Sequence, residues 1–186
     1  MTVYNRTAAK SKAWAAHHGG AAAPPPAAAA ADADLVFCCF GDDPAVLSVA
    51  LGDDGAIPAM KTGAVFIDNS TVSADVARQV YDAAKAMGVH TLDAPVSGGQ
   101  AGAENGKLTV MVGGDDAAFA AALPLLVCYG ARVVQLGDDG KGQQATVVNQ
   151  FLIARLVQAC SDGLCIGMES GLENDSRISH FSAGSA

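Results

Sequence analysis

Three groups of residues have the types and spacing to bind a small ligand. The first is Asn5, Arg6 and Thr7, which follow an apolar run near Thr2–Asn5 that is predicted to be a strand. In a dinucleotide-binding fold the end of the second strand faces the adenosine ribose, where an acidic residue reads the 2′-hydroxyl and an arginine accommodates a 2′-phosphate. Arg6 has no acidic neighbour, so this pattern favours NADP over NAD. An arginine after a strand is also typical of a solvated surface. The motif by itself is therefore weak evidence for cofactor binding and needs support from the rest of the sequence.

The second group begins at Asp93 and runs through Ser97, Gly98 and Gly99 to Ala103. This pattern predicts a strand end, a glycine-rich turn and a short alanine-rich helix. Backbone N–H groups at such a helix start bind a carboxylate or phosphate well, and the Ser97 hydroxyl adds a donor. Glycines that only form a tight turn would have the same spacing, so both interpretations stay open at this point.

The third group lies near the start of a long helical pattern that runs from about Lys141 to Glu169. Gly142, Thr146 and Asn149 are spaced i, i+4 and i+7, so they share one face of this helix. Asn149 can form a hydrogen bond with a substrate from that face. The alternative is a helix interface in which the polar residues are satisfied by protein partners.

The elements that must position these groups follow from the hydrophobic pattern. Between Thr2 and Leu136 short apolar runs alternate with longer alanine-rich stretches, which predicts βαβ units and a parallel sheet. Strands are expected near Thr2–Asn5, Leu35–Phe40, Ala64–Asp68, Val89–Asp93, Leu108–Val112 and Arg132–Leu136. Helices are expected near Ala8–His17, Pro44–Leu51, Ser73–Met87 and Ala117–Cys128. The proline-containing segment Ala21–Ala31 predicts a loop with a short helix after the prolines.

Composition narrows the class of protein. The 186 residues are 51% hydrophobic and 16% charged, with 11 basic and 19 acidic side chains and a net charge of −8. A nucleic-acid-binding protein would be expected to have a basic stripe, which these scattered basic residues do not form. No uncharged apolar run reaches the roughly 18–20 residues that span a bilayer, and the first residues lack the apolar stretch of a signal peptide. We therefore expect a soluble cytoplasmic protein that does not bind nucleic acid or a membrane.

Paired acidic residues and cysteines suggest a metal site, but local structure explains them better. Asp-Asp pairs occur at 42/43, 53/54, 115/116 and 138/139, each beside a helix start or a turn. Aspartate oxygens at such positions cap free backbone N–H groups. The adjacent Cys38 and Cys39 would point to opposite faces of a strand. The sequence therefore predicts no metal site.

With these stretches in place, the chain resembles the β-hydroxyacid dehydrogenase family, which includes 3-hydroxyisobutyrate dehydrogenase and tartronate semialdehyde reductase and belongs to the superfamily of the 6-phosphogluconate dehydrogenase NADP-binding domain. The resemblance covers about residues 2–172. Its most specific part is Asp93–Gly114, which is similar to the family's substrate-binding signature almost residue for residue. The resemblance implies a Rossmann-like, doubly wound sheet followed by one long interdomain helix.

The resemblance also implies an activity and a set of site residues. The activity is reversible hydride transfer between NADP(H) and a short β-hydroxyacid or its semialdehyde, with NAD as the less favoured cofactor. The substrate would be bound by Ser97, Gly98, Gly99 and Asn149. The cofactor would be bound by Asn5, Arg6, Thr7, Phe40, Gly41 and Thr71.

One departure from the family lies at the catalytic position. The family has a lysine on the long helix where this chain has Thr146, and that lysine is the general acid/base for the substrate hydroxyl. A threonine hydroxyl neither titrates near neutral pH nor carries a positive charge. Its presence is expected to lower the rate by on the order of a hundredfold to ten-thousandfold. Lys141 projects roughly 140° away around the helix and cannot substitute.

The other departure is at the start of the fold. The family begins with a strand, a G-x-G-x-x-G turn and a helix, whereas this chain begins at what resembles the second strand and contains no such motif. NADP binding is therefore expected to be weak or absent. In the strand order 3-2-1-4-5-6 the missing strand is central, so the first strands should lose their connection to the rest of the sheet and leave exposed edges.

These departures predict a chain shortened at both ends. We expect a truncated dinucleotide-binding domain over 1–136, an interdomain helix over 137–172 that starts a helical domain, and a disordered tail over 173–186. The apolar surface of the long helix predicts a homo-oligomer. Two functions follow: a crippled NADP-dependent dehydrogenase, or a catalytically inactive remnant that acts as a binding or dimerisation partner.

Overall fold

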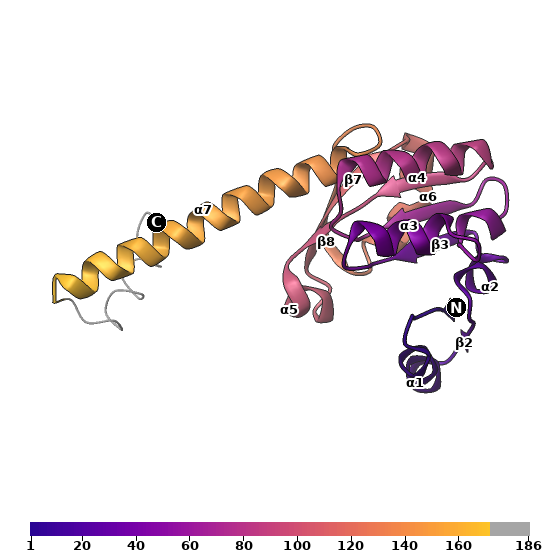
Figure 1. Cartoon of the computed structure of the whole chain (residues 1–186), viewed down its shortest axis with the longest axis horizontal. Coiled ribbons are helices and arrows are strands. Elements are labelled where there is room, and N and C mark those ends of the chain that lie inside the picture. Colours follow the sequence, from indigo (N-terminus) through magenta and orange to yellow (C-terminus); the bar gives the residue numbers. More distant parts are fainter. Residues whose placement is uncertain (172–186) are drawn as a thin grey trace. The chain divides into compact units, whose positions relative to one another are not determined.

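The computed structural model describes residues 1–171 (Figure 1). The predicted tail over 173–186 lies outside the described residues. The chain divides into two compact units, residues 1–146 and residues from 147 onward. Helix α7 (Lys141–Glu169) begins in the first unit and continues into the second. Asn149 belongs to the second unit, and the other candidate site residues belong to the first.

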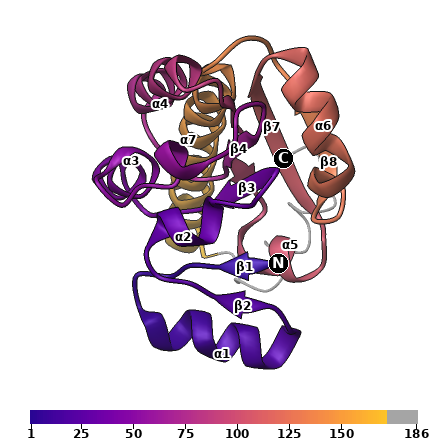
Figure 2. The same cartoon turned by 90° about the vertical axis from the view of Figure 1, so that its right-hand side faces the viewer.

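The first unit begins with a small two-stranded sheet. Strands β1 (Thr2–Val3) and β2 (Ala21–Ala22) pair in parallel, with α1 (Ala8–His18) between them along the chain (Figure 2). The prediction of a loop over Ala21–Ala31 is wrong for β2, because alanine has little strand propensity and only the pairing with β1 makes these residues a strand. Helix α2 (Pro26–Ala30) forms after the prolines, as predicted.

The second sheet has six strands: β3 (Leu35–Cys38), β4 (Val65–Asp68), β5 (His90–Asp93), β6 (Val96–Ser97), β7 (Leu108–Gly114) and β8 (Gly130–Gln135). Strands β3, β4 and β5 are parallel neighbours, as predicted. Strand β7 runs antiparallel to β5 and β6, and β8 pairs in parallel with β7. The prediction of a fully parallel sheet is therefore wrong. A parallel connection needs a crossover of a dozen or more residues, and the segment between β6 and β7 holds only α5 (Gly99–Glu104).

The main helices are α3 (Asp43–Leu51), α4 (Ala74–Ala86) and α6 (Asp116–Leu126), and Ile57–Ala59 forms a short 3-10 helix, η1. Side-chain oxygens of Asp42, Ser73 and Asp115 accept hydrogen bonds from backbone N–H groups in the first turns of α3, α4 and α6. Two of the four Asp-Asp pairs thus contain helix caps, as predicted.

Two apolar clusters cover opposite faces of the large sheet. Phe66 and Ile67 are neighbours on β4, and because successive strand residues point to opposite faces, Phe66 belongs to one cluster and Ile67 to the other. The Phe66 cluster includes residues of α3 and α4, and the Ile67 cluster includes residues of α6. Helices on both faces make this a doubly wound, Rossmann-like sheet, which confirms the predicted fold class.

The small sheet is not paired with the large one. The prediction that the first strands lose their connection to the rest of the sheet is therefore confirmed. Each sheet ends in a strand whose outer edge has no strand neighbour among the described residues, β1 in one sheet and β3 in the other.

Helix α7 presents many apolar side chains to solvent: Val147, Val148, Phe151, Leu152, Ile153, Leu156, Val157, Ile166 and Met168. Within residues 1–171 it is the one helix that by length and composition could cross a membrane, and only 6% of its most apolar window is buried. Arg155 and Asp162 lie within it, so the run is not uncharged. Exposing so much apolar surface to water is unfavourable in free energy. Apolar surfaces of this size are typical of sites where another protein or a membrane binds.

Two isoleucines of opposite exposure test this description. Ile67→Ala removes a side chain that is 0% exposed and is expected to lower the free energy of unfolding by about 2–5 kcal/mol. Ile166→Ala, at a side chain that is 65% exposed, is expected to change it by less than about 0.5 kcal/mol. Urea unfolding at low protein concentration measures both. Equal losses in the two variants would contradict the assigned burial.

Candidate functional site

The carboxyl ends of β3, β4 and β5 meet at one edge of the large sheet, which is where open α/β sheets bind ligands. The Cys38 thiol donates a hydrogen bond to Asp68 Oδ1 (3.2 Å), and the Asn69 N–H donates to the Cys38 carbonyl (2.8 Å). The Ala94 N–H donates to the Asp68 carbonyl (2.7 Å). These contacts fix the three strand ends relative to one another.

Ser70 joins the loops that follow β3 and β4. The Phe40 N–H donates to Ser70 Oγ (2.8 Å), and the Ser70 N–H donates to Asp68 Oδ1 (2.8 Å). Gly41 and Thr71, both exposed, directly follow Phe40 and Ser70 along the chain. The structure therefore brings Phe40, Gly41 and Thr71, three predicted cofactor-binding residues, into one neighbourhood.

The buried Asp68 and Cys38 have a structural role. Burial raises the pKa of Asp68, and the hydrogen bonds from Ser70 and Cys38 act in the opposite direction. Burial, followed by the nearby Asp68 charge, raises the pKa of the Cys38 thiol well above its usual range. A protonated thiol that donates to a carboxylate is not an activated nucleophile. This pair holds the strand ends together.

Asp93, at the end of β5, binds the start of α7. Its Oδ1 accepts from the Gly140 N–H (2.8 Å) and its Oδ2 accepts from the Gln143 N–H (2.7 Å). A carboxylate at this position also complements the positive end of the helix dipole. Burial raises the pKa of Asp93 to about 6, although the two backbone hydrogen bonds lower it.

Gln143 connects the start of α7 to the loop after β4. Its side chain is 0% exposed, its Nε2 donates to the Ser70 carbonyl (2.7 Å), and its Oε1 accepts from the Val72 N–H (3.2 Å). Gly142 lets the helix approach this closely, because a Cβ there would overlap the backbone carbonyl oxygens of Asp93 and Met111. The first turn of α7 is thus fixed against both β5 and the loop after β4.

Gln143 is not among the predicted site residues, and Asp93 is predicted only as the first residue of the substrate-binding signature, with no role of its own. The signal that could have found them is a glycine followed by a glutamine at the start of an apolar helix, because a buried amide needs partners. Those partners lie some 50–73 positions away along the chain, so spacing does not reveal them.

Thr146 and Ser97 lie on one face of the large sheet. Ser97 is opposite Thr109 in the antiparallel β6–β7 pair, and side chains of directly opposed residues point to the same face. Thr146 is 2% exposed, and its Oγ1 donates to Sδ of Met111 (3.8 Å), which lies on the Thr109 face of β7. The structure therefore places the predicted substrate-binding serine and the position of the family lysine around the same strand.

The turn after Ser97 requires glycine. Gly98 and Gly99 have φ values of 133° and 62°, a region that other residues rarely adopt. Gly98 is the N-cap of α5, which confirms the predicted short helix after the turn. Both glycines are exposed.

Asn5, Arg6 and Thr7 form an exposed turn between β1 and α1. Asn5 Oδ1 accepts from the Thr7 N–H (2.8 Å), a local bond typical of asparagine turns. Thr7 is the N-cap of α1, its side chain makes no capping hydrogen bond, and the first turn of α1 has no acidic residue. The helix N-terminus and the Arg6 guanidinium together provide donors and positive charge for an anion.

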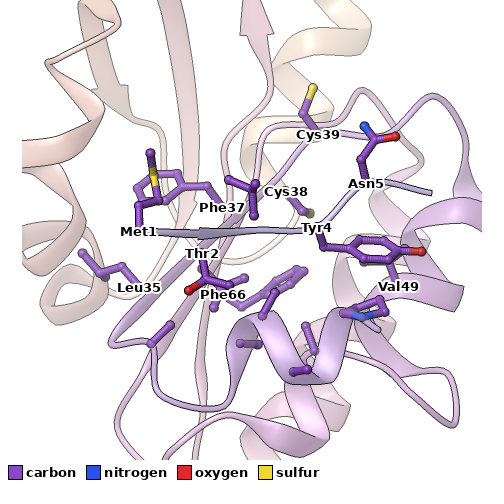
Figure 3. A pocket seen from close by; sticks show the side chains of 18 of the residues that line it. Met1, Thr2, Tyr4, Asn5, Leu35, Phe37, Cys38, Cys39, Val49 and Phe66 are labelled. Atoms are coloured by element: carbon purple, nitrogen blue, oxygen red, sulfur yellow. The ribbon is translucent and has the colours of Figure 1, made fainter. Parts of the chain in front are cut away.

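A cavity of about 540 Å³ lies between β1 and β3. Asn5 and Phe40, predicted cofactor-binding residues from the two sheets, both line it. Figure 3 shows Asn5 and Cys39 at one end of this cavity and Met1 and Leu35 at the other.

The chain is similar to known oxidoreductases. Residues 1–137 match the sequence family described as the NAD binding domain of 6-phosphogluconate dehydrogenase. The chain is 44% identical over 186 residues to an uncharacterized oxidoreductase of Shewanella frigidimarina, covering 100% of this chain and 64% of that protein. It is 39% identical over 145 residues to the 3-hydroxyisobutyrate dehydrogenase of Pseudomonas aeruginosa, covering 73% of this chain and 49% of the relative.

A solved structure of 3-hydroxyisobutyrate dehydrogenase from Mycobacterium tuberculosis, with L-serine, has a TM-score of 0.88 and 30% identity, covering 98% of this chain and 61% of that chain. The fold and these matches define an NAD(P)-binding oxidoreductase domain. The chain belongs to the β-hydroxyacid dehydrogenase family, which shares this domain with 6-phosphogluconate dehydrogenase. It spans less than two thirds of the length of the relatives it matches.

The residues present fit two parts of a dinucleotide. The turn at Arg6 and the start of α1 suit a phosphate monoester, because they combine a cation with helix N–H groups and no nearby acid in that turn. Gly41 has open space around it, so a flat ligand can approach the backbone after β3. The first turn of α3, which follows Gly41, contains Asp43 and is capped by Asp42, so it does not favour a pyrophosphate.

The pH dependence of stability tests the Asp93 contact. Because the folded-state pKa of about 6 lies above the usual 3.8, this group stabilises the fold most at low pH, and its contribution is lost as pH rises through 6. Between pH 4 and 6.5 the free energy of unfolding of the natural chain should fall by about 2–3 kcal/mol relative to Asp93→Asn. Urea unfolding across this range measures the difference.

Asp34→Asn, at an exposed carboxylate, is the matched control and should follow the profile of the natural chain. Parallel profiles for the natural chain and Asp93→Asn would show that Asp93 does not titrate in this window and would contradict the assignment.

Proposed function

We propose that this chain is an NADP(H)-binding dehydrogenase of the β-hydroxyacid type in which proton transfer is slow. The observation that carries the proposal is the placement of Ser97 and position 146 on one face around β7. In this family a substrate carboxylate and a substrate hydroxyl must be bound at once. The matches to bacterial oxidoreductases, one of them a 3-hydroxyisobutyrate dehydrogenase, support the same reaction class and the proposed cytoplasmic location.

The choice of NADP over NAD is proposed from the turn after β1. A 2′-phosphate would lie between the Arg6 guanidinium and the N-terminus of α1, with Asn5 and Thr7 completing the turn. NADH lacks this phosphate, so an acidic residue would be expected here in an NAD-preferring chain. Phe40, Gly41 and Thr71 are proposed to contact the other end of the cofactor, near the nicotinamide and its ribose.

The proposed role of Arg6 gives a direct binding test. Arg6→Ala should weaken NADPH binding by about tenfold to a hundredfold, since it removes a charge-assisted contact, and should leave NADH binding unchanged. Lys12→Ala, at an exposed lysine in α1 beyond its first three residues, is the matched control. Isothermal titration measures the affinities of the natural chain and of both variants for NADPH and NADH. A loss of equal size for both nucleotides would contradict the role of Arg6 as the 2′-phosphate contact, and no NADPH binding by the natural chain at millimolar concentration would overturn the proposed function.

The proposed substrate-binding site consists of residues of this chain. The Ser97 hydroxyl and the backbone N–H groups of Gly98 and Gly99 are proposed to bind the carboxylate of a short β-hydroxyacid or semialdehyde, and Asn149 is proposed to contact the same substrate. A nicotinamide held near Phe40, Gly41 and Thr71 would supply or accept the hydride. At position 146 this chain has a buried threonine, whose hydroxyl neither titrates near neutral pH nor carries the positive charge that would stabilise a substrate alkoxide.

Restoring an ionisable group tests this explanation. Thr146→Lys should raise the turnover of a panel of short semialdehydes by about 10²–10⁴-fold, while Thr146→Met, of similar length and uncharged, should not. Circular dichroism establishes whether both variants fold, since Thr146 is buried. If the natural chain turns over as fast as Thr146→Lys, proton transfer at position 146 is not what limits the rate.

A second function is favoured by the exposed apolar residues of α7. We propose that this helix mediates self-association, either of an active enzyme or of a catalytically inactive chain that acts as a dimerisation partner. Replacing Phe151 and Leu156 by aspartate should shift the molecular mass in sedimentation equilibrium from a dimer or larger species to a monomer. Arg155→Ala on the same helix is the control. A monomer at all concentrations of the natural chain would exclude this role.

A further inference from the structure

The segment that joins β5 to β6 leads to the proposed carboxylate site and is fixed from both faces of the large sheet. On one face, Asp93 accepts hydrogen bonds from the start of α7. On the other face, Ala94 belongs to the Ile67 cluster and is 0% exposed. Ser97 follows three residues later along the chain, so a shift of Ala94 would displace the turn that begins at Ser97.

Asn69 provides a polar contact on the second of these faces. Its Nδ2 donates to the Ala94 carbonyl (2.7 Å), and its own N–H donates to the Cys38 carbonyl (2.8 Å). Because a carbonyl oxygen can only accept, this contact determines which end of the Asn69 amide group faces Ala94. Asn69 therefore links the ends of β3 and β4 to the segment that leads to Ser97.

Tyr129 fixes the other end of the Asn69 amide group. Its hydroxyl donates to Asn69 Oδ1 (3.1 Å), and its ring lies edge-on to the Phe37 ring with the two centroids 6.3 Å apart. The Tyr129 carbonyl also accepts from the Leu108 N–H at the start of β7 (3.1 Å). Burial raises the pKa of Tyr129, so its hydroxyl stays protonated near neutral pH and remains a donor.

The hydrogen bonds of these residues form a series with one direction. Tyr129 donates to Asn69, and Asn69 donates to Ala94. In such a series each hydrogen bond polarises the next one. Without the Asn69 side chain, the Ala94 carbonyl would lose this donor inside an apolar cluster, which is unfavourable. The segment would then move to bring this carbonyl closer to water.

The position of Asn69 along the chain connects two parts of the proposed site. Thr71, a proposed contact of the nicotinamide end of the cofactor, follows Asn69 by two residues. Ser97, a proposed contact of the substrate, follows Ala94 by three residues. The side chain of Asn69 thus fixes the proposed substrate turn against the proposed cofactor loop, and reacting groups need such alignment.

We propose that Asn69 and Tyr129 are positioning residues for the substrate. Through Ala94 they place the hydroxyl and the backbone N–H groups of residues 97–99 where a substrate carboxylate binds. This inference rests on the proposed function, because both residues act through the proposed carboxylate site. Neither of them contacts the substrate or the cofactor in this proposal.

The affinity of the 186-residue chain for 3-hydroxyisobutyrate tests the proposal. NADPH is present throughout, because a reduced cofactor and a hydroxyacid do not react with each other. Asn69→Ala and Tyr129→Phe should each weaken hydroxyacid binding by about threefold to tenfold and leave the NADPH affinity unchanged. NMR titration of the Gly98 and Gly99 amide signals measures the hydroxyacid, and isothermal titration measures NADPH.

Two further variants separate positioning from general support of the fold. Tyr81→Phe is the matched control, because it removes a hydroxyl that accepts from Lys85 on α4, and it should bind the hydroxyacid like the natural chain. The double variant Asn69→Ala/Tyr129→Phe should bind no more weakly than Asn69→Ala alone, because Tyr129 acts through Asn69.

Amide hydrogen exchange in the chain without ligands tests the contact itself. The Ala94 N–H donates to the Asp68 carbonyl (2.7 Å), so its exchange rate reports on the position of the segment. It should exchange about tenfold faster in both single variants, as expected for the loss of one hydrogen bond. The His90 N–H, which donates to the Ala64 carbonyl at the other end of β5 (2.9 Å), should keep its natural rate.

Equal hydroxyacid affinity of the variants and the natural chain, or an unchanged exchange rate at Ala94, would overturn the proposal. Equal losses of hydroxyacid and NADPH affinity would also overturn it, because they would show a general loss of structure. No hydroxyacid binding by the natural chain would instead overturn the proposed function, and the Ala94 exchange rate would then decide whether Asn69 and Tyr129 fix the segment. If Asn69→Ala does not fold, Tyr129→Phe, which keeps the ring, decides the question.

Discussion

The structure of the site depends on the contact between the Asp93 carboxylate and the backbone N–H groups of Gly140 and Gln143. This contact fixes the start of α7 at the carboxyl end of β5. Gln143, positioned by it, then reaches the loop after β4 through Ser70 and Val72. One buried carboxylate thus determines where the helix begins, and therefore where position 146 lies relative to β7.

This arrangement buries the Asp93 carboxyl group and the Gln143 side-chain amide, which is unfavourable for both polar groups. Gly113 and Gly142 both approach Asp93 so closely that a Cβ at either position would overlap its atoms. The same close packing desolvates the carboxylate and raises its pKa. Two N–H donors at a helix N-terminus offset part of the desolvation. Rigidity at this point is what a site that must orient a small substrate requires.

Much of the fold follows from local sequence signals, because apolar runs bounded by turn residues define β3, β4 and β5, and aspartate caps define α3 and α6. What could not be predicted depends on contacts distant in sequence. Strand β2 exists only through its pairing with β1, and the antiparallel direction of β7 depends on β6, which is two residues long. The pairing of Asp93 with α7 spans about 50 positions, so no local pattern indicates it. Residue types and spacing indicated the turns at Arg6 and Ser97 and the helix position of Asn149, and the family resemblance added Phe40, Gly41, Thr71 and the role of position 146. Only the structure reveals the buried contacts of Asp93 and Gln143 that support them.

The two sheets carry different parts of the proposed site. The β1 sheet carries the proposed 2′-phosphate contact at Arg6, and the large sheet carries Ser97 and Thr146. The position of Thr146 on the large sheet depends on Asp93, because Asp93 fixes the start of α7.

The most direct test of the central contact is a ¹³C NMR titration of the Asp93 side-chain carboxyl in the folded chain. A midpoint near pH 6 is expected, together with shifts of the Gly140 and Gln143 amide signals over the same pH range. A midpoint near the ordinary aspartate value of about 3.9, with no response from those two amides, would show that Asp93 is solvated and does not bind the start of α7.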